Sequence, residues 1–220
     1  MPYKIRKFIQ RLNGAWYDFL FRVKFPETHR IIEKIKGGGA YNVGNGKYFE
    51  LFKLLNQFRP KSILELGGGG STAVFATYAK EAGAKVCSVD QHKKWLENTK
   101  TAIGELSSFV EFLLLPAKRE GENSPKGFYV GLENKYFDFV YVDGPSFGFD
   151  ASNKHLNRRT ISRNVIDLIE SNPPRVVVLD GRRVTAHHIE ANYNNLYNRY
   201  SNLSLSLYLR GTFSFCEKKH

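Results

Sequence analysis

Four consecutive glycines, residues 67–70, follow a short apolar segment and precede a segment with helical periodicity. The apolar segment, residues 62–66, is typical of a strand buried in a parallel sheet. Glycines at this point let the backbone approach a ligand without a Cβ atom in the way, and Ser71 or Thr72 can cap the helix that follows. The sequence therefore predicts a strand, a ligand-binding loop and a helix.

The second predicted strand ends in Asp90, about 20 residues beyond the glycines. At this spacing a carboxylate meets the ribose hydroxyls of a nucleotide bound to a βαβ unit. A dinucleotide-binding fingerprint fits Gly67 and Gly69, but Thr72 stands at its third glycine position, where a side chain impedes close helix packing. Glu65, just before the glycines, has no role in that fingerprint. The pattern thus favours a different nucleoside-containing cofactor.

Residues 65–69 resemble the E/D-x-G-x-G signature of class I S-adenosylmethionine-dependent methyltransferases, and Asp90 matches that family's acidic residue after the second strand. Residues 64–72 and 88–96 are similar to a methyltransferase group, called methyltransferase domain 24-like. In that group the loop reads E-x-G-x-G-x-S-T and the second strand runs into an acidic-x-H-x-x-W pattern. The resemblance covers about residues 60–217.

This resemblance implies a Rossmann-like doubly wound α/β sheet of five parallel strands plus a C-terminal antiparallel hairpin. The alternating pattern of residues 203–209, followed by residues 212–216, independently predicts the hairpin. The resemblance also implies S-adenosylmethionine as cofactor and methyl transfer as activity. The residues it assigns to the cofactor are Glu65, Gly67, Gly68, Gly69, Ser71, Thr72, Asp90, Gln91, Ala117 and Asp143.

Two later predicted strands end in aspartates, Asp143 after strand four and Asp180 after strand five. Open α/β sheets bind ligands at the carboxyl ends of their strands, so both aspartates are expected at one edge. Asp143 is the better catalytic candidate. A carboxylate at that position can orient a substrate hydroxyl, face the sulfonium region of the cofactor or hold a divalent cation.

Catechol-like and some sugar O-methyltransferases bind magnesium with a carboxylate after strand four and an acidic-acidic or acidic-amide pair after strand five. Gly181 stands where the second oxygen ligand of that pair would be, so a magnesium ion here needs another ligand or water. In the alternative interpretation, Asp143 orients the acceptor hydroxyl and His187, on the next predicted helix, takes its proton. The missing ligand slightly favours the histidine.

The first residues predict a basic amphipathic helix, with lysines and arginines mostly outside its apolar stripe. That stripe consists of Ile5, Phe8, Ile9, Leu12, Trp16, Phe19, Leu20 and Val23. Charged residues interrupt every apolar run, which excludes a transmembrane span. The stripe packs on the domain or on a second subunit, or alternatively binds a membrane surface or nucleic acid. We expect residues 1–59 to form this helical extension and residues 60–220 to form the methyltransferase domain.

Two further segments carry functional expectations. The glycine-rich residues 37–46 can form a hinge that folds Tyr41 or Asn42 over the cofactor, or an ordinary linker. A helix predicted over residues 156–170 has three arginines in its first turns, and these either clamp an anionic group or form a solvated helix face. The arginines are Arg158, Arg159 and Arg163.

Composition limits the remaining choices. A chain of 220 residues with 42% hydrophobic residues suits one domain, and two cysteines, Cys87 and Cys216, suit a reducing, cytoplasmic compartment. The net charge is +12, of which residues 1–60 carry +8, which suggests an anionic partner. We therefore expect O-methylation of a small-molecule or sugar-like acceptor, with RNA methylation or a non-catalytic cofactor-binding module as alternatives. Peripheral membrane contact and a homo-oligomer are both compatible with the sequence.

Overall fold

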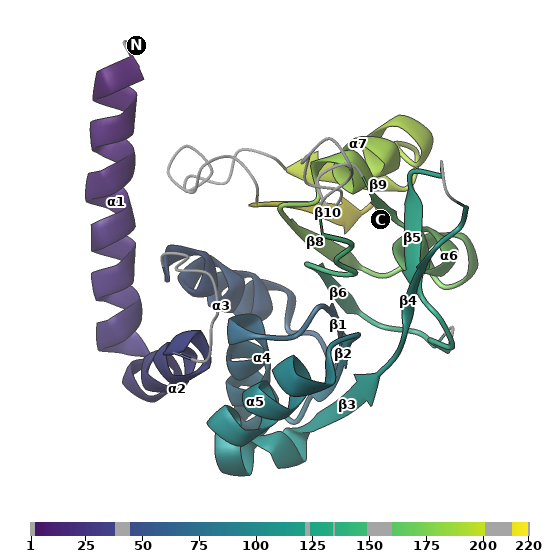
Figure 1. The fold of residues 1–220 in the computed structure, drawn as a ribbon. Coiled ribbons are helices and arrows are strands. Elements are labelled where there is room, and N and C mark those ends of the chain that lie inside the picture. Colours follow the sequence, from purple (N-terminus) through teal and green to yellow (C-terminus); the bar gives the residue numbers. More distant parts are fainter. Residues whose placement is uncertain are drawn as a thin grey trace.

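A seven-stranded sheet forms the centre of the computed structural model (Figure 1), which describes residues 3–37, 45–121, 124–133, 135–148, 160–200 and 213–219. Its strand order is β3-β2-β1-β6-β8-β10-β9. The strands are β1 (Ser62–Leu66), β2 (Lys85–Asp90), β3 (Val110–Leu114), β6 (Phe139–Val142), β8 (Val176–Asp180), β9 (Tyr197–Tyr200) and β10 (Phe213–Lys218).

Five of these strands, from β3 to β8 in the sheet order, are parallel, while β10 runs antiparallel to both β8 and β9. The predicted parallel sheet with an antiparallel C-terminal pair is therefore present. Residues 203–209, which the alternating pattern assigned to the hairpin, lie outside the described residues. The described pair consists of β9 and β10 on either side of them.

Helices cover both faces of the sheet (Figure 1). They are α1 (Tyr3–Lys24), α2 (Pro26–Gly37), α3 (Gly46–Phe58), α4 (Gly70–Ala82), α5 (Lys93–Ile103), the 3-10 helix η1 (Gly104–Phe109), α6 (Arg163–Ser171) and α7 (Arg183–Asn192). One apolar cluster joins α2, α3 and α4 to strand residues such as Ile63 and Phe139, and a second joins α6 and α7 to strand residues such as Leu64 and Val140. Alternate residues of each strand thus face opposite helix layers, as a doubly wound sheet requires.

A second sheet, of order β4-β5-β7, was not predicted. It consists of β4 (Ala117–Arg119), β5 (Lys126–Tyr129) and β7 (Ile161–Ser162). The segment 119–127 joins β4 to β5, and both of its ends pair in this sheet. Strands of two to four residues are too short to show a period in the sequence.

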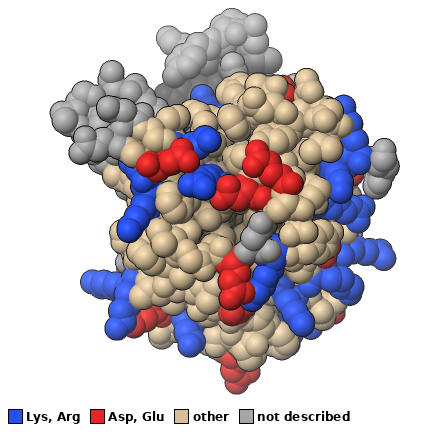
Figure 2. Space-filling view, turned by 90° about the vertical axis from the view of Figure 1, so that its right-hand side faces the viewer, with Lys and Arg blue, Asp and Glu red and all other residues tan. Residues whose placement is uncertain are grey.

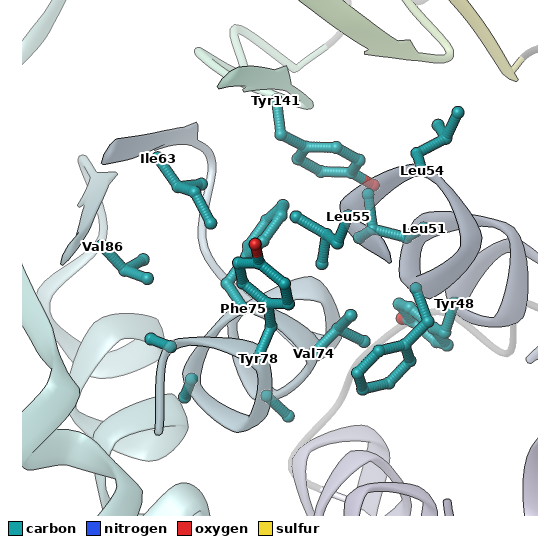
Figure 3. Packing of buried hydrophobic residues seen from close by; sticks show 14 of the residues in the cluster. Tyr48, Leu51, Leu54, Leu55, Ile63, Val74, Phe75, Tyr78, Val86 and Tyr141 are labelled. Atoms are coloured by element: carbon teal, nitrogen blue, oxygen red, sulfur yellow. The ribbon is translucent and has the colours of Figure 1, made fainter. Parts of the chain in front are cut away.

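The N-terminal helices belong to the same core as the sheet. Phe21 of α1, Ile32 of α2 and Leu55 of α3 are fully buried in the cluster that contains Phe75 and Tyr141. Figure 3 shows the α3 side chains packed against those of α4 and the strands. The hydrophobic core is therefore continuous across residue 59, where we expected the extension to meet the domain.

Several other expectations are resolved or fall outside the described chain. Tyr41, Asn42, Arg158 and Arg159 are among the residues that the structure does not describe. Both cysteines are buried free thiols, so no disulfide joins them. Within the described ranges, no helix has the length and apolarity that a membrane span requires.

Leu55→Ala tests whether α3 is integral to the domain. Leu55 is fully buried, so its truncation should lower the free energy of unfolding by about 2–5 kcal/mol. Leu114→Ala, at an exposed position on β3, is the matched control and should change that free energy by less than about 0.5 kcal/mol. Urea unfolding of both variants gives the comparison, and equal stabilities would show that α3 contributes little to the core.

Candidate cofactor and acceptor site

The glycine loop is the turn between β1 and α4. Gly67 has a φ of +93°, a left-handed conformation that side chains other than glycine rarely adopt. A Cβ atom on Gly67 would lie 2.7 Å from the backbone nitrogen of Gly144, and so the end of β1 can approach the chain that follows β6 only if this residue is glycine. The loop therefore lies directly beside Asp143 and Gly144.

The carboxylate of Glu65 is buried beneath this loop. It accepts hydrogen bonds from Ser71 Oγ at 2.5 Å, Thr72 Oγ1 at 2.7 Å and Ser88 Oγ at 2.6 Å. Burial raises the pKa of Glu65 to about 7 despite these three bonds, which by themselves lower it. We expected Glu65, Ser71 and Thr72 to bind the cofactor; the structure turns their side chains inward, where they fix the loop.

Asp90 lies at the carboxyl end of β2, next to the loop, as predicted. Its Oδ2 accepts a hydrogen bond from the Gly68 N–H at 3.2 Å, and its Oδ1 accepts one from the His92 N–H at 2.8 Å. The indole of Trp95 donates to the Gly68 carbonyl oxygen at 2.6 Å. Burial raises the pKa of Asp90, and the backbone bonds partly offset this. A carboxylate has about four acceptor sites, so Asp90 can still accept a hydrogen bond from a ligand hydroxyl.

Gln91 directly follows β2, and Ala117 begins β4. The Gln91 side chain donates to the Ser146 carbonyl oxygen at 2.6 Å and accepts from the Ser146 N–H at 3.3 Å, which ties β2 to the loop after β6. Ala117 pairs with Tyr129, and the Tyr129 hydroxyl reaches the space that a Cβ atom of Gly144 would take. The chain segments that follow β3 and β6 therefore meet beside the glycine loop.

An ion pair lies at the end of β8. Asp180 Oδ2 accepts a hydrogen bond from Lys47 Nζ at 2.6 Å and one from the Tyr141 hydroxyl at 2.7 Å. Burial alone raises the pKa of Asp180, but the charge and hydrogen bond of Lys47 outweigh it and lower the pKa. Burial lowers the pKa of Lys47, but the Asp180 carboxylate outweighs this effect and the net shift is upward. Both groups are therefore ionised at neutral pH.

Lys47 belongs to α3, within the segment that we assigned to the extension. The same helix places the Tyr48 hydroxyl where a Cβ atom on Gly70 would lie. Helix α3, which we expected to belong to the extension, therefore contributes side chains to this region. Two consecutive residues of α3 contact the site, one at the acceptor edge and one at the glycine loop.

Asp143 follows β6 and sits beside this ion pair. Asp143 is exposed to solvent. The surrounding protein, and then the Asp180 carboxylate, raise the pKa of Asp143, whereas Lys47 and Arg182 act in the opposite direction. The predicted meeting of Asp143 and Asp180 at one edge is thus present in the structure.

The buried guanidinium of Arg182 positions the chain that carries Asp143. It donates hydrogen bonds to the main-chain carbonyl oxygens of Asp143 and, at 2.9 Å, of Pro145. These bonds fix the main chain around Asp143. Sequence reasoning missed Arg182, although its place two residues after the end of β8 was a usable signal.

The structure does not bring His187 to the aspartates. The His187 side chain is 69% exposed on α7, and its described contacts are Glu190, at 3.5 Å, and Arg199, at 3.2 Å. Asp143 therefore has no described histidine partner for proton transfer.

Arg163, one of the three arginines expected at the start of a helix, contacts Glu120 at 3.3 Å and Asp167 at 3.5 Å on an exposed surface. These contacts support the solvated-face interpretation for Arg163.

The side chains at this edge do not fit a magnesium ion. Lys47 and Tyr141 already bind Asp180 Oδ2, and Gly181 offers no side-chain oxygen. Within the described part of the chain, no three His, Cys, Asp or Glu side chains are grouped to hold a metal. The positive charge beside Asp180 and Asp143 is the ammonium group of Lys47.

Glu65→Gln should change how stability depends on pH. The pKa of Glu65 rises from 4.5 to about 7 on folding, so the folded state holds the proton more tightly. The free energy of unfolding should then fall as pH rises from about 4.5 to about 7, by on the order of 3 kcal/mol, and level off above. Urea unfolding of Glu65→Gln should lack this decline. Exposed Glu97→Gln should retain it, and a decline shared by all three proteins would contradict the assignment.

No protein-family model and no curated protein matches the chain, but solved structures do. A proposed caffeoyl-CoA O-methyltransferase from Staphylococcus aureus has a TM-score of 0.63 and 13% identity, covering 94% of this chain and 100% of that one. The O-methyltransferase TomG from Streptomyces achromogenes, involved in tomaymycin synthesis and solved with S-adenosylmethionine, has a TM-score of 0.60 and 14% identity, with 92% and 96% covered.

An O-methyltransferase from Bacillus cereus, solved with S-adenosylhomocysteine, has a TM-score of 0.57 and 16% identity, covering 92% of this chain and 96% of that one. At such identities the likeness concerns the fold. It spans 92–94% of this chain. The chain therefore has the fold of the class I S-adenosylmethionine-dependent methyltransferases.

Proposed function

We propose that the protein is an S-adenosylmethionine-dependent methyltransferase that methylates a hydroxyl oxygen. One observation carries this proposal: the glycine loop lies directly against the chain that bears Asp143. A Cβ atom on Gly67 would lie 2.9 Å from the Asp143 carbonyl carbon. A cofactor held by the loop and an acceptor held at Asp143 would then be adjacent, which in-line transfer requires. Similar folds hold S-adenosylmethionine or S-adenosylhomocysteine, which supports this assignment.

The residues present fit this cofactor. The glycines leave room for a ligand beside the backbone, and Asp90 keeps acceptor capacity for a ribose hydroxyl. Ala117 lies at the neighbouring strand end and offers a small apolar surface to an adenine ring. When bound, the cofactor supplies a methyl group already activated by a sulfonium centre, so the protein has mainly to position the acceptor and remove its proton.

Asp143 is the base in this proposal. Its pKa is raised toward the range in which a carboxylate both exists ionised and accepts a proton effectively. The acceptor hydroxyl gives its proton to the Asp143 carboxylate as its oxygen gains the methyl group. Lys47, which remains protonated, stabilises negative charge that develops on that oxygen. Asp180 keeps Lys47 in place through the 2.6 Å ion pair.

The acceptor class follows from the charges at this edge. The ammonium group of Lys47 favours a small-molecule or sugar-like acceptor that carries an anionic group or forms an oxyanion. RNA is the second candidate acceptor. On the face drawn in Figure 2, Lys and Arg side chains are interspersed with Asp and Glu. Transfer of label from methyl-labelled S-adenosylmethionine to sugar, lipid and RNA pools distinguishes these acceptors, and no transfer to any pool would favour a non-catalytic module.

Asp90→Ala should weaken S-adenosylhomocysteine binding. Loss of charge-assisted bonds worth about 1.5–3 kcal/mol corresponds to roughly a tenfold to 150-fold rise in Kd. Titration calorimetry measures this change, with Glu105→Ala, an exposed carboxylate on η1, as the control expected to bind like wild type. Unchanged affinity in Asp90→Ala would refute Asp90 as the ribose anchor.

Asp143→Asn should lower kcat/KM by about 10²–10⁴-fold while the Kd for S-adenosylhomocysteine stays within a few-fold of wild type. An unprotonated carboxylate is required, so wild-type kcat/KM should rise with pH through the elevated pKa of Asp143. Chelators should have no effect, because Lys47 supplies the positive charge. The companion variant His187→Ala should remain active. Inactive His187→Ala together with active Asp143→Asn would reverse the assignment of the base.

A further inference from the structure

Helix α1 exposes a row of large apolar side chains. Leu12, Trp16, Phe19 and Val23 are 55%, 55%, 45% and 59% exposed. At 3.6 residues per turn, these four positions fall within a sector of about 60° on the helix circumference. The rings of Trp16 and Phe19 stack with their centroids 5.8 Å apart. We call these four residues the α1 stripe.

The opposite side of α1 is held against the body of the protein. Phe21 is fully buried, and the Tyr17 ring lies 5.8 Å from that of Phe49 in α3. Figure 1 shows α1 at the side of the molecule, outside the helix layers that cover the sheet. The α1 stripe is therefore not the face by which this helix packs on its own chain.

The charged residues of α1 also differ between its exposed side and the side that faces the body of the protein. The helix contains six lysines and arginines and a single acidic residue, Asp18. Asp18 faces the body, where its Oδ1 accepts a hydrogen bond from the Asn45 N–H at 3.3 Å. Arg22 and Lys24 are exposed, and each lies about 100° from Val23 on either side of the α1 stripe. The exposed apolar row thus has basic margins.

We propose that α1 binds the surface of a membrane that contains anionic lipid, with the α1 stripe in the acyl boundary and the basic margins at the headgroups. Aromatic rings flanked by basic residues are the combination that an interfacial helix uses. The proposal does not depend on the proposed enzymatic function.

Charge decides between this partner and a second copy of the chain. Two α1 stripes packed together would bring the basic margins of both helices side by side, in either relative orientation, and like charges at such an interface are unfavourable. An anionic lipid surface neutralises the same margins instead. The margins also account for the concentration of positive charge in the first 60 residues, which carry +8 of the net +12.

Co-sedimentation of the full chain with vesicles tests the proposal. Wild type should bind phosphatidylcholine vesicles that contain phosphatidylserine, bind pure phosphatidylcholine more weakly, and lose affinity as salt rises. The double variant Trp16→Ser, Phe19→Ser should reduce binding about tenfold or more, because it removes the two largest apolar groups of the stripe. Reversal of charge in Arg22→Glu, Lys24→Glu should reduce binding to anionic vesicles specifically.

The matched control is Phe109→Ser, Tyr136→Ser, which removes two exposed aromatic residues elsewhere on the surface. This control should bind vesicles like wild type. Thermal unfolding should show that all variants remain folded, as expected for exposed positions. The proposal is overturned if wild type does not bind the vesicles or if control and stripe variants lose binding equally. It is also overturned if sedimentation equilibrium shows a dimer that the stripe variants abolish, without vesicle binding.

Discussion

The buried carboxylate of Glu65 connects three elements on which the cofactor loop depends. Its two oxygens receive hydroxyl groups from the start of α4 and from β2, while its backbone pairs with both neighbouring strands. A buried carboxylate is costly unless it is fully hydrogen-bonded, so these hydroxyls are needed and their positions are fixed. These hydrogen bonds hold the residues beneath the glycine loop and so fix the shape of the loop. The same burial raises the pKa of Glu65, so the protonation of this buried carboxyl group depends on pH in the neutral range.

At the acceptor edge, two aspartates have pKa values shifted in opposite directions. Lys47 lowers the pKa of Asp180, whereas the enclosing protein and Asp180 itself raise the pKa of Asp143. Such a separation gives two similar carboxylates different roles: one remains an ionised partner and the other can exchange a proton. Among O-methyltransferases that use magnesium, a metal supplies positive charge at this edge. In the proposed function, the Lys47 side chain from α3 supplies positive charge here, beside Asp180.

Much of the fold could be predicted from local pattern. The apolar runs indicated β1, β2, β6 and β8, and Asp90 and Asp143 were found because Asp90 ends a strand and Asp143 directly follows one. Lys47 could not be found in this way, because it is 133 residues from Asp180 and meets it only through the packing of α3. His187 was chosen for its chemistry, but the buried residues of α7 include Ala186 and Ile189, so position 187 faces outward. Helical phase, rather than residue type, was the better guide.

Helix α3 contacts the site and also packs against α1 through the Tyr17 and Phe49 rings. Phe25, which directly follows α1, stacks on Phe52 of α3 with ring centroids 3.9 Å apart. Aromatic packing of this kind leaves little room for relative motion. The distance and tilt between the outer surface of α1 and the carboxyl edge of the sheet are consequently set by the fold. An enzyme anchored by that surface would select acceptors by their height above the anchoring plane, in addition to their chemistry.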